Sequence, residues 1–309
     1  MTGVSVGIGC PVCGGHDHRA RFRAAGPGTE LGVDPQSFRP SADRFGEALG
    51  LVVRCRACGH QFVEHAPSPD DVRAAYNDAV DEVSVREEEG QVETARRALG
   101  RIEATVTPGL VCDLGCWTGS FLVAARERGW RTAGVELSRW ASHRAAERGL
   151  DVRQGELHDS GLDAGTCRLV VLTDVLEHLA DPGDALSEAH RLLEPEGVVW
   201  ITVPDAGSRL ARALGRRWWS VLPMHLQYFT AASMEQLLAR HGFRVIWRGT
   251  HAKVFTARYY AERLGGYHQA LERATVGAVT RARVADRLVA PDFRDRLAVL
   301  AIREDSYVD

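Results

Sequence analysis

Four of the seven cysteines form two C-x-x-C pairs, a spacing that lets two thiolates bind one metal ion. The pairs are Cys10–Cys13 and Cys55–Cys58, and each is followed directly by a glycine. Together they supply the four soft ligands of a closed tetrahedral zinc site. A redox dithiol or disulfides are the alternative, but matched pairs in a chain that we expect to be cytoplasmic favour zinc. We therefore expect a structural Zn²⁺ ion that folds residues 1–66. Three nearby histidines could replace a cysteine ligand: His16, His18 and His60.

The turn from Asp113 to Gly119 is the second segment whose spacing indicates chemistry, and it follows a short apolar run. A dinucleotide-binding turn has the pattern G-x-G-x-x-G, whose second glycine lets the backbone approach a pyrophosphate. Trp117 occupies that place here, so the turn suits a ligand with an adenosine but no phosphates. Glu136, twenty-one positions after Gly115, could accept both ribose hydroxyl protons. The alternative is that Gly115 and Gly119 only serve the turn and that Glu136 is a solvated strand end.

Apolar runs and helical patterns alternate from residue 110 onward, which predicts a mostly parallel, doubly wound sheet. The expected fold class is α/β, with a seven-stranded Rossmann-like sheet and a small N-terminal zinc-ribbon-like module. The expected strands are 110–114, 131–137, a short one at Val152, 168–173, 197–203, 243–247 and 297–302. The clearest expected helices are 86–103, one that starts at Asp181–Pro182, and 230–241, which Gly242 ends.

Breaks in these patterns suggest how the chain is divided. Proline and glycine interrupt the periodic segments at 67–70 and at 107–109. We expect a zinc-binding module at 1–66, a helical linker or lid at 67–106 and the sheet domain at 107–309. Within that domain, residues of about 251–293 carry helical stretches and are expected to form a substrate-covering insertion.

In this order, the motifs resemble those of class I S-adenosylmethionine (SAM) dependent methyltransferases. The resemblance covers about residues 85–250, through the segments 113–119, Glu136, 173–179, 191–197 and 201–204. The family implies that the first segment holds the methionine part of SAM, that Glu136 holds the ribose, that residues 155–157 flank the adenine and that Asp174 faces the methionine end. The candidate cofactor-binding residues are therefore Asp113, Gly115, Cys116, Trp117, Gly119, Glu136, Leu137, Glu156, Leu157 and Asp174. Trp117 departs from the small residue that the family often has, and we expect it to pack over the ligand or to narrow the pocket.

The two cysteine pairs ahead of this domain, followed by Tyr76, resemble a bacterial subgroup often associated with glycan or natural-product biosynthesis, antibiotics included. The segments 216–219 and 225–230 are similar to the same subgroup. The resemblance implies a small-molecule acceptor, and we expect SAM-dependent O-methylation of a sugar or natural-product scaffold. N- or C-methylation of a natural product or a nucleotide sugar stays open.

Methyl transfer to a hydroxyl group calls for a general base, because a sugar hydroxyl is too weak an acid to lose its proton unaided. His225 is the first candidate, since it follows the fifth strand among aromatic residues and histidine titrates near neutrality. His178, which follows Glu177, is the second. The structural alternatives are that His225 bonds to the backbone beneath a loop and that His178 supports a turn. Four aromatic residues could stack on an acceptor or pack in the core: Trp218, Trp219, Tyr228 and Phe229.

Composition and motifs weigh against several other classes of protein. The 309 residues are 45% hydrophobic with a net charge of −3, which excludes a disordered or fibrous chain. No run of eighteen apolar residues and no secretory signal pattern is present, so we expect a cytoplasmic protein without a membrane partner. A zinc-ribbon nucleic-acid methyltransferase is opposed by the mild acidity and by residues 173–176, which lack the N/D-P-P-Y pattern of amino-base enzymes. We therefore expect no nucleic-acid partner. A nicotinamide oxidoreductase is opposed by Trp117, whereas a non-enzymatic SAM-binding scaffold stays open, as does the oligomeric state.

Overall fold

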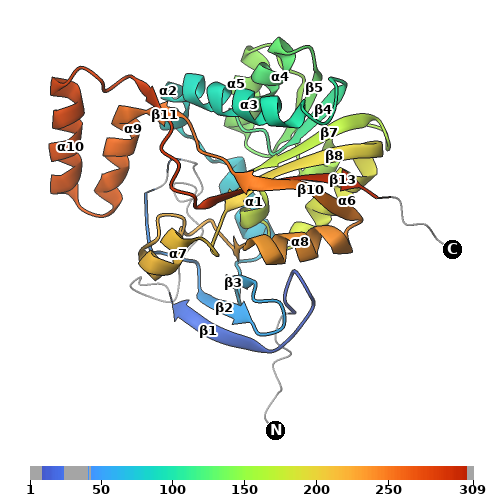
Figure 1. Cartoon of the computed structure of the whole chain (residues 1–309), viewed down its shortest axis with the longest axis horizontal. Helices are drawn as coiled ribbons and strands as arrows, with labels where there is room; N and C mark the ends of the chain where they lie inside the picture. The colour runs from blue at the N-terminus through green and yellow to red at the C-terminus, as the bar shows by residue number, and fades with distance from the viewer. Residues whose placement is uncertain (1–8, 24–40, 42, 305–309) are drawn as a thin grey trace, which may run out of the picture.

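The computed structural model describes residues 9–23, 41 and 43–304, and its centre is a seven-stranded sheet (Figure 1). The strand order is β10-β13-β8-β7-β4-β5-β6. β13 runs antiparallel to both of its neighbours, whereas the other neighbouring strands are parallel. The predicted α/β fold with a mostly parallel sheet is thereby confirmed. The strands are β4 (Leu110–Leu114), β5 (Arg131–Glu136), β6 (Val152–Gln154), β7 (Cys167–Thr173), β8 (Leu193–Pro204), β10 (Phe243–Thr250) and β13 (Arg296–Arg303).

Helices cover both faces of the sheet (Figure 1). On one face, Leu99 of α3 is buried together with Trp200 of β8, and on the other Leu186 of α6 is buried together with Leu237 of α8. The apolar stripe of each helix thus faces the sheet, as the helical spacing predicts. One face carries α3 (Glu88–Ile102), α4 (Ser120–Glu127) and α5 (Arg139–Glu147), and the other carries α6 (Pro182–Leu192) and α8 (Ala231–Arg240).

The predicted element boundaries agree with the structure to within a few residues. The first strand of the sheet, β4, has the expected bounds, and α6 begins after Asp181, whose carboxylate accepts the N–H of Gly183 at 2.8 Å. β10 runs past its expected end at Trp247, because a bulge after Val245 lets it continue pairing with β13. β8 starts earlier than expected, since Leu193 pairs with β7.

The N-terminal module is a four-stranded antiparallel sheet whose last strand comes from a distant part of the chain. Its order is β1-β2-β3-β9. The strands are β1 (His18–Arg23), β2 (Leu51–Cys55), β3 (Gln61–Val63) and β9 (Gln227–Tyr228). The module predicted for residues 1–66 therefore shares its sheet with the domain that follows.

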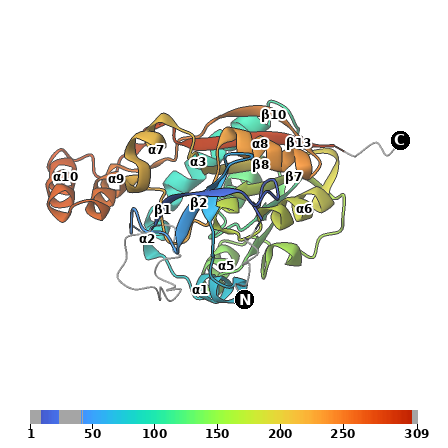
Figure 2. The same ribbon diagram turned by 90° about the horizontal axis from the view of Figure 1, so that it is seen from below.

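The remaining elements surround the carboxyl ends of the main strands or project from the body. α9 and α10 stand out to one side in both views (Figures 1 and 2). No helix among the described residues is both long enough and apolar enough to cross a bilayer. The helices are α1 (Pro69–Asn77), α2 (Glu82–Arg86), α7 (Arg209–Leu214), α9 (Ala257–Glu262) and α10 (Gln269–Arg281). The 3₁₀ helices are η2 (Leu157–Asp159), η3 (Leu176–His178), η4 (Gly215–Arg217) and η5 (Arg263–Gly266), and β11 (Phe255–Thr256) pairs with β12 (Leu288–Val289).

Two glycines of α3 test how closely this helix packs on the segment after β10. A Cβ added to Gly90 would lie 2.3 Å from the carbonyl oxygen of Val254, whereas one added to Gly100 meets no atom within 4 Å. We expect Gly90→Ala to lower the free energy of unfolding by about 1–3 kcal/mol through overpacking. Gly100→Ala should raise it by up to about 1 kcal/mol through helix propensity. Urea unfolding measures both, and equal effects would contradict the close approach.

Candidate active site and metal centre

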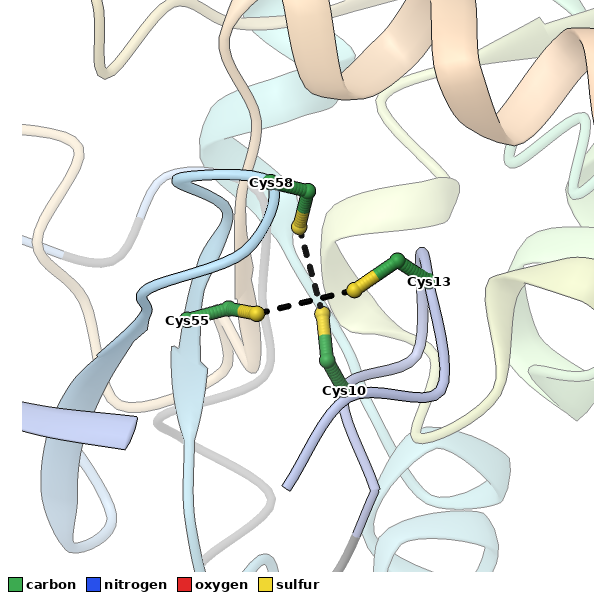
Figure 3. A group of neighbouring side chains, drawn as sticks. All are labelled: Cys10, Cys13, Cys55 and Cys58. Atoms are coloured by element: carbon green, nitrogen blue, oxygen red, sulfur yellow. Dashed lines mark hydrogen bonds between the residues drawn. The ribbon is translucent and has the colours of Figure 1, made fainter. Parts of the chain in front are cut away.

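The predicted metal ligands converge on one point. The thiols of Cys10, Cys13, Cys55 and Cys58 lie within 4.8 Å of one another (Figure 3). The Sγ–Sγ distance is 3.5 Å both between Cys10 and Cys58 and between Cys13 and Cys55. Four sulfurs at about 2.3 Å from a tetrahedral zinc ion would lie about 3.8 Å apart. The cluster therefore fits a zinc ion without any further ligand.

The backbone around the four cysteines also suits a bound cation. In each pair, the sulfur of the first cysteine accepts hydrogen bonds from the N–H groups two and three residues further along. The glycines that follow the pairs, Gly14 and Gly59, have φ angles of 75° and 77°, which turn the chain back as expected. His18 is not needed as a ligand, because its Nε2 donates to the carbonyl oxygen of Gly15 at 2.8 Å.

His60 connects the zinc-binding turns to the main domain. It is fully buried, and its Nε2 lies 2.9 Å from Gln227 Oε1 while its Nδ1 lies 3.3 Å from Ser233 Oγ. Gln227 Nε2 donates to the carbonyl oxygen of Leu179 at 2.9 Å. Burial lowers the pKa of His60 to about 4, so the imidazole is neutral. Two side chains thus link the metal centre to the loop after His178.

The main chain of Leu226 forms a second link. Val63, the last residue of β3, donates its N–H to the carbonyl oxygen of Leu226 at 2.9 Å. Leu226 donates its own N–H to the carbonyl oxygen of Glu177 at 2.7 Å. Because His225 directly precedes Leu226, the N-terminal module and η3, which follows β7, together hold the backbone that carries this histidine.

A cavity of about 830 Å³ lies where the carboxyl ends of β4, β5 and β7 meet. Nine of the ten predicted cofactor-binding residues line it, as do His178 and His225. Gly119 is outside the lining and precedes α4 with a φ of 79°. A Cβ at Gly119 would lie 2.2 Å from Leu150 Cδ1, so this glycine serves close packing. The structure therefore brings the separate motifs to one site.

Glu136, at the end of β5, stabilises the turn formed by residues 113–119. Its carboxylate accepts the N–H of Trp117 at 2.8 Å and that of Ser138 at 2.7 Å. Trp117 has a φ of 49°, a strained conformation for a bulky residue, and its indole N–H donates to Ser84 Oγ at 2.9 Å. The ring is thus held from α2 at the cavity wall. The N–H of Leu137 also donates to this carboxylate, which keeps further acceptor capacity for a ligand hydroxyl.

Asp113 is a buried carboxyl group at the end of β4. Burial, reinforced by the nearby charge of Glu136, raises the pKa of Asp113 to about 8. Burial also raises the pKa of Glu136, although the N–H groups of Ser138 and Trp117 oppose that shift. At neutral pH, Asp113 therefore carries a proton and can donate a hydrogen bond to a ligand.

Asp174, at the end of β7, is already paired with two cations. Its Oδ2 lies 2.6 Å from Lys253 Nζ, and its Oδ1 lies 2.5 Å from Arg296 Nη2. Burial would raise the pKa of Asp174, but the two cations hold it well below its usual range. Neither cation was predicted from the sequence. Lys253 is the single lysine in the chain, which was the one available signal, whereas nothing distinguishes Arg296 from the many other arginines.

His225 is a buried imidazole with one nitrogen available. Its Nδ1 donates to the carbonyl oxygen of Ser220 at 2.7 Å, which leaves Nε2 as an acceptor. Burial, with the neighbouring His178, lowers the pKa of His225 to about 3, so it is neutral across the physiological range. Polar atoms of His225, His178 and Glu177 lie within 4.8 Å of one another.

His178 is held more tightly than His225. The hydroxyl of Tyr76 lies 2.5 Å from His178 Nδ1, and the carbonyl oxygen of Met224 lies 3.2 Å from the same nitrogen. Burial lowers the pKa of His178 to about 4. Glu177 beside it is 1% exposed, and its Oε2 has no hydrogen-bond partner among the described residues. Burial and the charge of Asp174 raise the pKa of Glu177 to about 8.

Of the four aromatic residues expected to stack or pack, Trp219 lines the cavity. Trp218 is buried and donates its indole N–H to Asp295 Oδ2 at 2.8 Å. Tyr228 and Phe229 belong to the hydrophobic core. Residues 251–293, for which a substrate-covering insertion was predicted, supply further aromatic lining, although these aromatic residues were not singled out from the sequence: Phe255, Tyr259, Tyr260, Tyr267 and Phe293.

The turn can be tested with Gly115→Val. Gly115 has a φ of 81°, and a Cβ there would lie 2.8 Å from Val175 Cγ2. The new side chain would thus displace the turn, so we expect the affinity for S-adenosylhomocysteine (SAH) to fall about tenfold or more. Gly165→Val is the matched control, because Gly165 has a φ of 70° but no atom within 4 Å of an added Cβ. Calorimetric titration with SAH measures both, and unchanged affinity in Gly115→Val would contradict the site.

The link between the metal centre and the main domain can be tested with His60→Leu and Gln227→Met. Each variant leaves the partner's buried polar group unsatisfied, so we expect each to cost about 1–3 kcal/mol of stability. The double variant should lose less stability than the sum of the two single losses, by about 0.5 kcal/mol or more. Additive losses in urea unfolding would contradict a direct link, and zinc content measured on each variant checks that the metal centre is intact.

Comparisons with known proteins agree with this geometry. A family model described as a methyltransferase domain matches residues 85–247. The C-methyltransferase NovU from Streptomyces niveus is 27% identical over 204 residues, which cover 63% of this chain and 46% of NovU. The chain thus spans about half the length of that relative. A probable SAM-dependent methyltransferase from Mycolicibacterium smegmatis is 26% identical, over 64% of this chain and 72% of its own length.

Solved structures share the fold. A SAM-dependent methyltransferase from Archaeoglobus fulgidus has a TM-score of 0.50 at 18% identity, covering 72% of this chain and all (100%) of its own. Magnesium protoporphyrin IX methyltransferase from Synechocystis, with bound SAH, has a TM-score of 0.50 at 16% identity, covering 77% and 100%. Since the family model matches more than half of the chain and the motifs lie around one cavity, the protein belongs to the class I SAM-dependent methyltransferases.

Proposed function

We propose that this chain transfers the methyl group of SAM to a hydroxyl oxygen of a small-molecule acceptor, a sugar or a natural-product scaffold. The observation that carries the proposal is the position of His225 in the wall of the cavity that the predicted cofactor-binding residues line, with Nδ1 bonded to the carbonyl oxygen of Ser220 and Nε2 left as an acceptor. A base in that place is what transfer to a hydroxyl group needs.

The cofactor-binding residues would hold SAM across the ends of three strands. When bound, SAM supplies a sulfonium methyl group that is already activated for transfer. Glu136 would accept the ribose hydroxyl protons, and neutral Asp113 would donate a hydrogen bond. Gly115 keeps the turn open, Glu156 lies where the adenine edge is expected, and Asp174 stands at the methionine end. The remaining expected contacts are Cys116, Trp117, Leu137 and Leu157, which line the same cavity. Gly119 was also expected to contact SAM, and it packs closely against Leu150 outside the cavity lining.

His225 would act as the general base. Its Nε2 would take the proton of the acceptor hydroxyl, while SAM would supply the methyl group and its sulfur would keep the old bonding pair. The carbonyl oxygen of Ser220 accepts the Nδ1–H, which fixes the tautomer and stabilises the imidazolium. His178, tied to Tyr76, would keep the ring of His225 in place, because the two imidazole centroids lie 4.9 Å apart with their planes at 75°.

C-methylation is the second candidate, and the name of NovU favours it. An acidic C–H group beside a carbonyl needs the same base as a hydroxyl, so the position of His225 serves both reactions. An N-methylated acceptor stays open on the same geometry. The ¹³C chemical shift of a transferred [¹³C]methyl group separates oxygen, nitrogen and carbon acceptors.

The four-cysteine cluster would hold a structural zinc ion. All four sulfurs are internal ligands, so no position is left for a reacting group. Its contribution would be to fold the N-terminal module and, through β3, to hold the backbone of residues 225–228.

Methyl transfer itself is tested with labelled SAM and a panel of sugars and natural-product scaffolds. We expect label on a small-molecule oxygen, in the presence of zinc-loaded protein. Label on an RNA or DNA oligonucleotide included in the panel, with none on any small molecule, would overturn the proposal.

His225→Asn tests the base. We expect turnover to fall by about 10² to 10⁴-fold with SAH affinity nearly unchanged, because the residue acts on the acceptor's proton. His143→Asn, an exposed histidine outside the cavity lining, is the control and should be neutral. Since the pKa of His225 is lowered to about 3, kcat/KM of the native protein should show no acidic limb near pH 6.5. Normal turnover in His225→Asn would remove this residue as the base.

A further inference from the structure

Lys253 is the single lysine of the chain, and it lies in the wall of the cavity next to the end of β7. Its Nζ lies 2.6 Å from Asp174 Oδ2, and 34% of its side chain is exposed. Arg296 binds the other oxygen of Asp174 and also Thr202 Oγ1 at 3.0 Å, and 16% of its side chain is exposed. Two cations therefore share one carboxylate, and Lys253 is the more accessible of the two.

Other ionisable groups lie around this pair. Burial raises the pKa of Glu177 to about 8 and lowers the pKa values of His178 and His225, so both histidines are neutral. Asp295, the residue before Arg296, is a second acidic group close enough to interact with the charge of Arg296, and its Oδ2 accepts the indole N–H of Trp218. An ammonium group has three donors, and Asp174 takes one of them.

Both polar groups of the peptide unit that follows Lys253 are hydrogen-bonded. Its carbonyl oxygen accepts the hydroxyl proton of Tyr260 at 2.7 Å, and the N–H of Val254 donates to Thr94 Oγ1 at 2.7 Å. Nζ lies 5.9 Å from the ring centroid of Phe255, which lines the same cavity. The ammonium group is thus positioned in advance, beside an aromatic wall.

We propose that Lys253 binds a carboxylate of the methyl acceptor, so that the acceptors of this protein are anionic small molecules with a flat apolar part. A carboxylate of the acceptor can accept hydrogen bonds from the ammonium donors that Asp174 leaves free. The proposal rests on the methyl transfer proposed above. SAM itself carries a carboxylate that Lys253 could bind. The experiment below distinguishes the carboxylate of SAM from that of the acceptor.

The experiment uses the full-length, zinc-loaded protein labelled with [ε-¹⁵N]lysine, in which Lys253 is the only lysine to give a signal. The protein is saturated with SAH and titrated with 4-hydroxybenzoate or with its neutral analogue, 4-hydroxybenzamide. We expect 4-hydroxybenzoate to shift the Nζ resonance and to bind about tenfold or more tightly than the amide, as a charge-assisted hydrogen bond implies. Equal affinities, or a resonance that 4-hydroxybenzoate does not move, would overturn the proposal.

Variants identify the group that the ammonium binds. Lys253→Gln should weaken 4-hydroxybenzoate about tenfold or more, and should weaken SAH and the amide by a clearly smaller factor. Lys253→Arg keeps the charge and should retain most of the affinity for 4-hydroxybenzoate. This variant tests the proposal even if Lys253→Gln folds poorly. Arg244→Gln, which removes an exposed cation paired with Glu304, is the charge-matched control and should change nothing. If Lys253→Gln weakens SAH as much as 4-hydroxybenzoate, the lysine holds the donor and this proposal fails. Failure of the native protein to bind SAH at all would instead defeat the methyl transfer.

Discussion

The backbone of Leu226 is the point at which the parts of this molecule meet. Its carbonyl oxygen receives the N–H of Val63 from the cysteine-bearing module, and its N–H reaches the carbonyl oxygen of Glu177 at the end of the main sheet. Buried backbone groups are costly to leave unpaired, so neither part can move without the other. The side chain that we propose as the base, His225, is the residue next to it. The fold of the zinc-binding turns and the position of the base are therefore mechanically coupled.

The donor side of the cavity depends on a different constraint, the strained backbone at the strand ends. Trp117 and Asp174 have φ angles of 49° and 57°, which side chains rarely adopt. A carboxylate takes part in holding each of them: that of Glu136 accepts the N–H of Trp117, and that of Asp174 itself is paired with Lys253 and Arg296. Such strain persists where surrounding bonds determine the conformation, as at ligand-binding turns. The arrangement also explains why a tryptophan can stand in a turn that otherwise favours glycine.

The sequence was most informative where local patterns decide structure. The bounds of β4 follow from an apolar run, and the start of α6 follows from the capping residue Asp181. The spacing of the four cysteines is enough to predict their cluster. Features that depend on distant partners could not be predicted. β9 has two residues and forms only because β3 lies beside it, and the pairs of Asp174 with Lys253 and Arg296 join segments that are far apart in the chain. Gly119 was assigned to the ligand by its place in the motif, whereas packing against Leu150 accounts for it.

We infer that one chain combines a four-cysteine zinc centre with a SAM-binding cavity whose wall that centre supports. Native mass spectrometry of the purified protein, before and after incubation with SAM, tests both halves at once. We expect one zinc ion per chain as purified, and one molecule of SAM or SAH per zinc-loaded chain after incubation. A chain without zinc, or a zinc-loaded chain that takes up no SAM or that carries a nicotinamide nucleotide instead, would contradict the account.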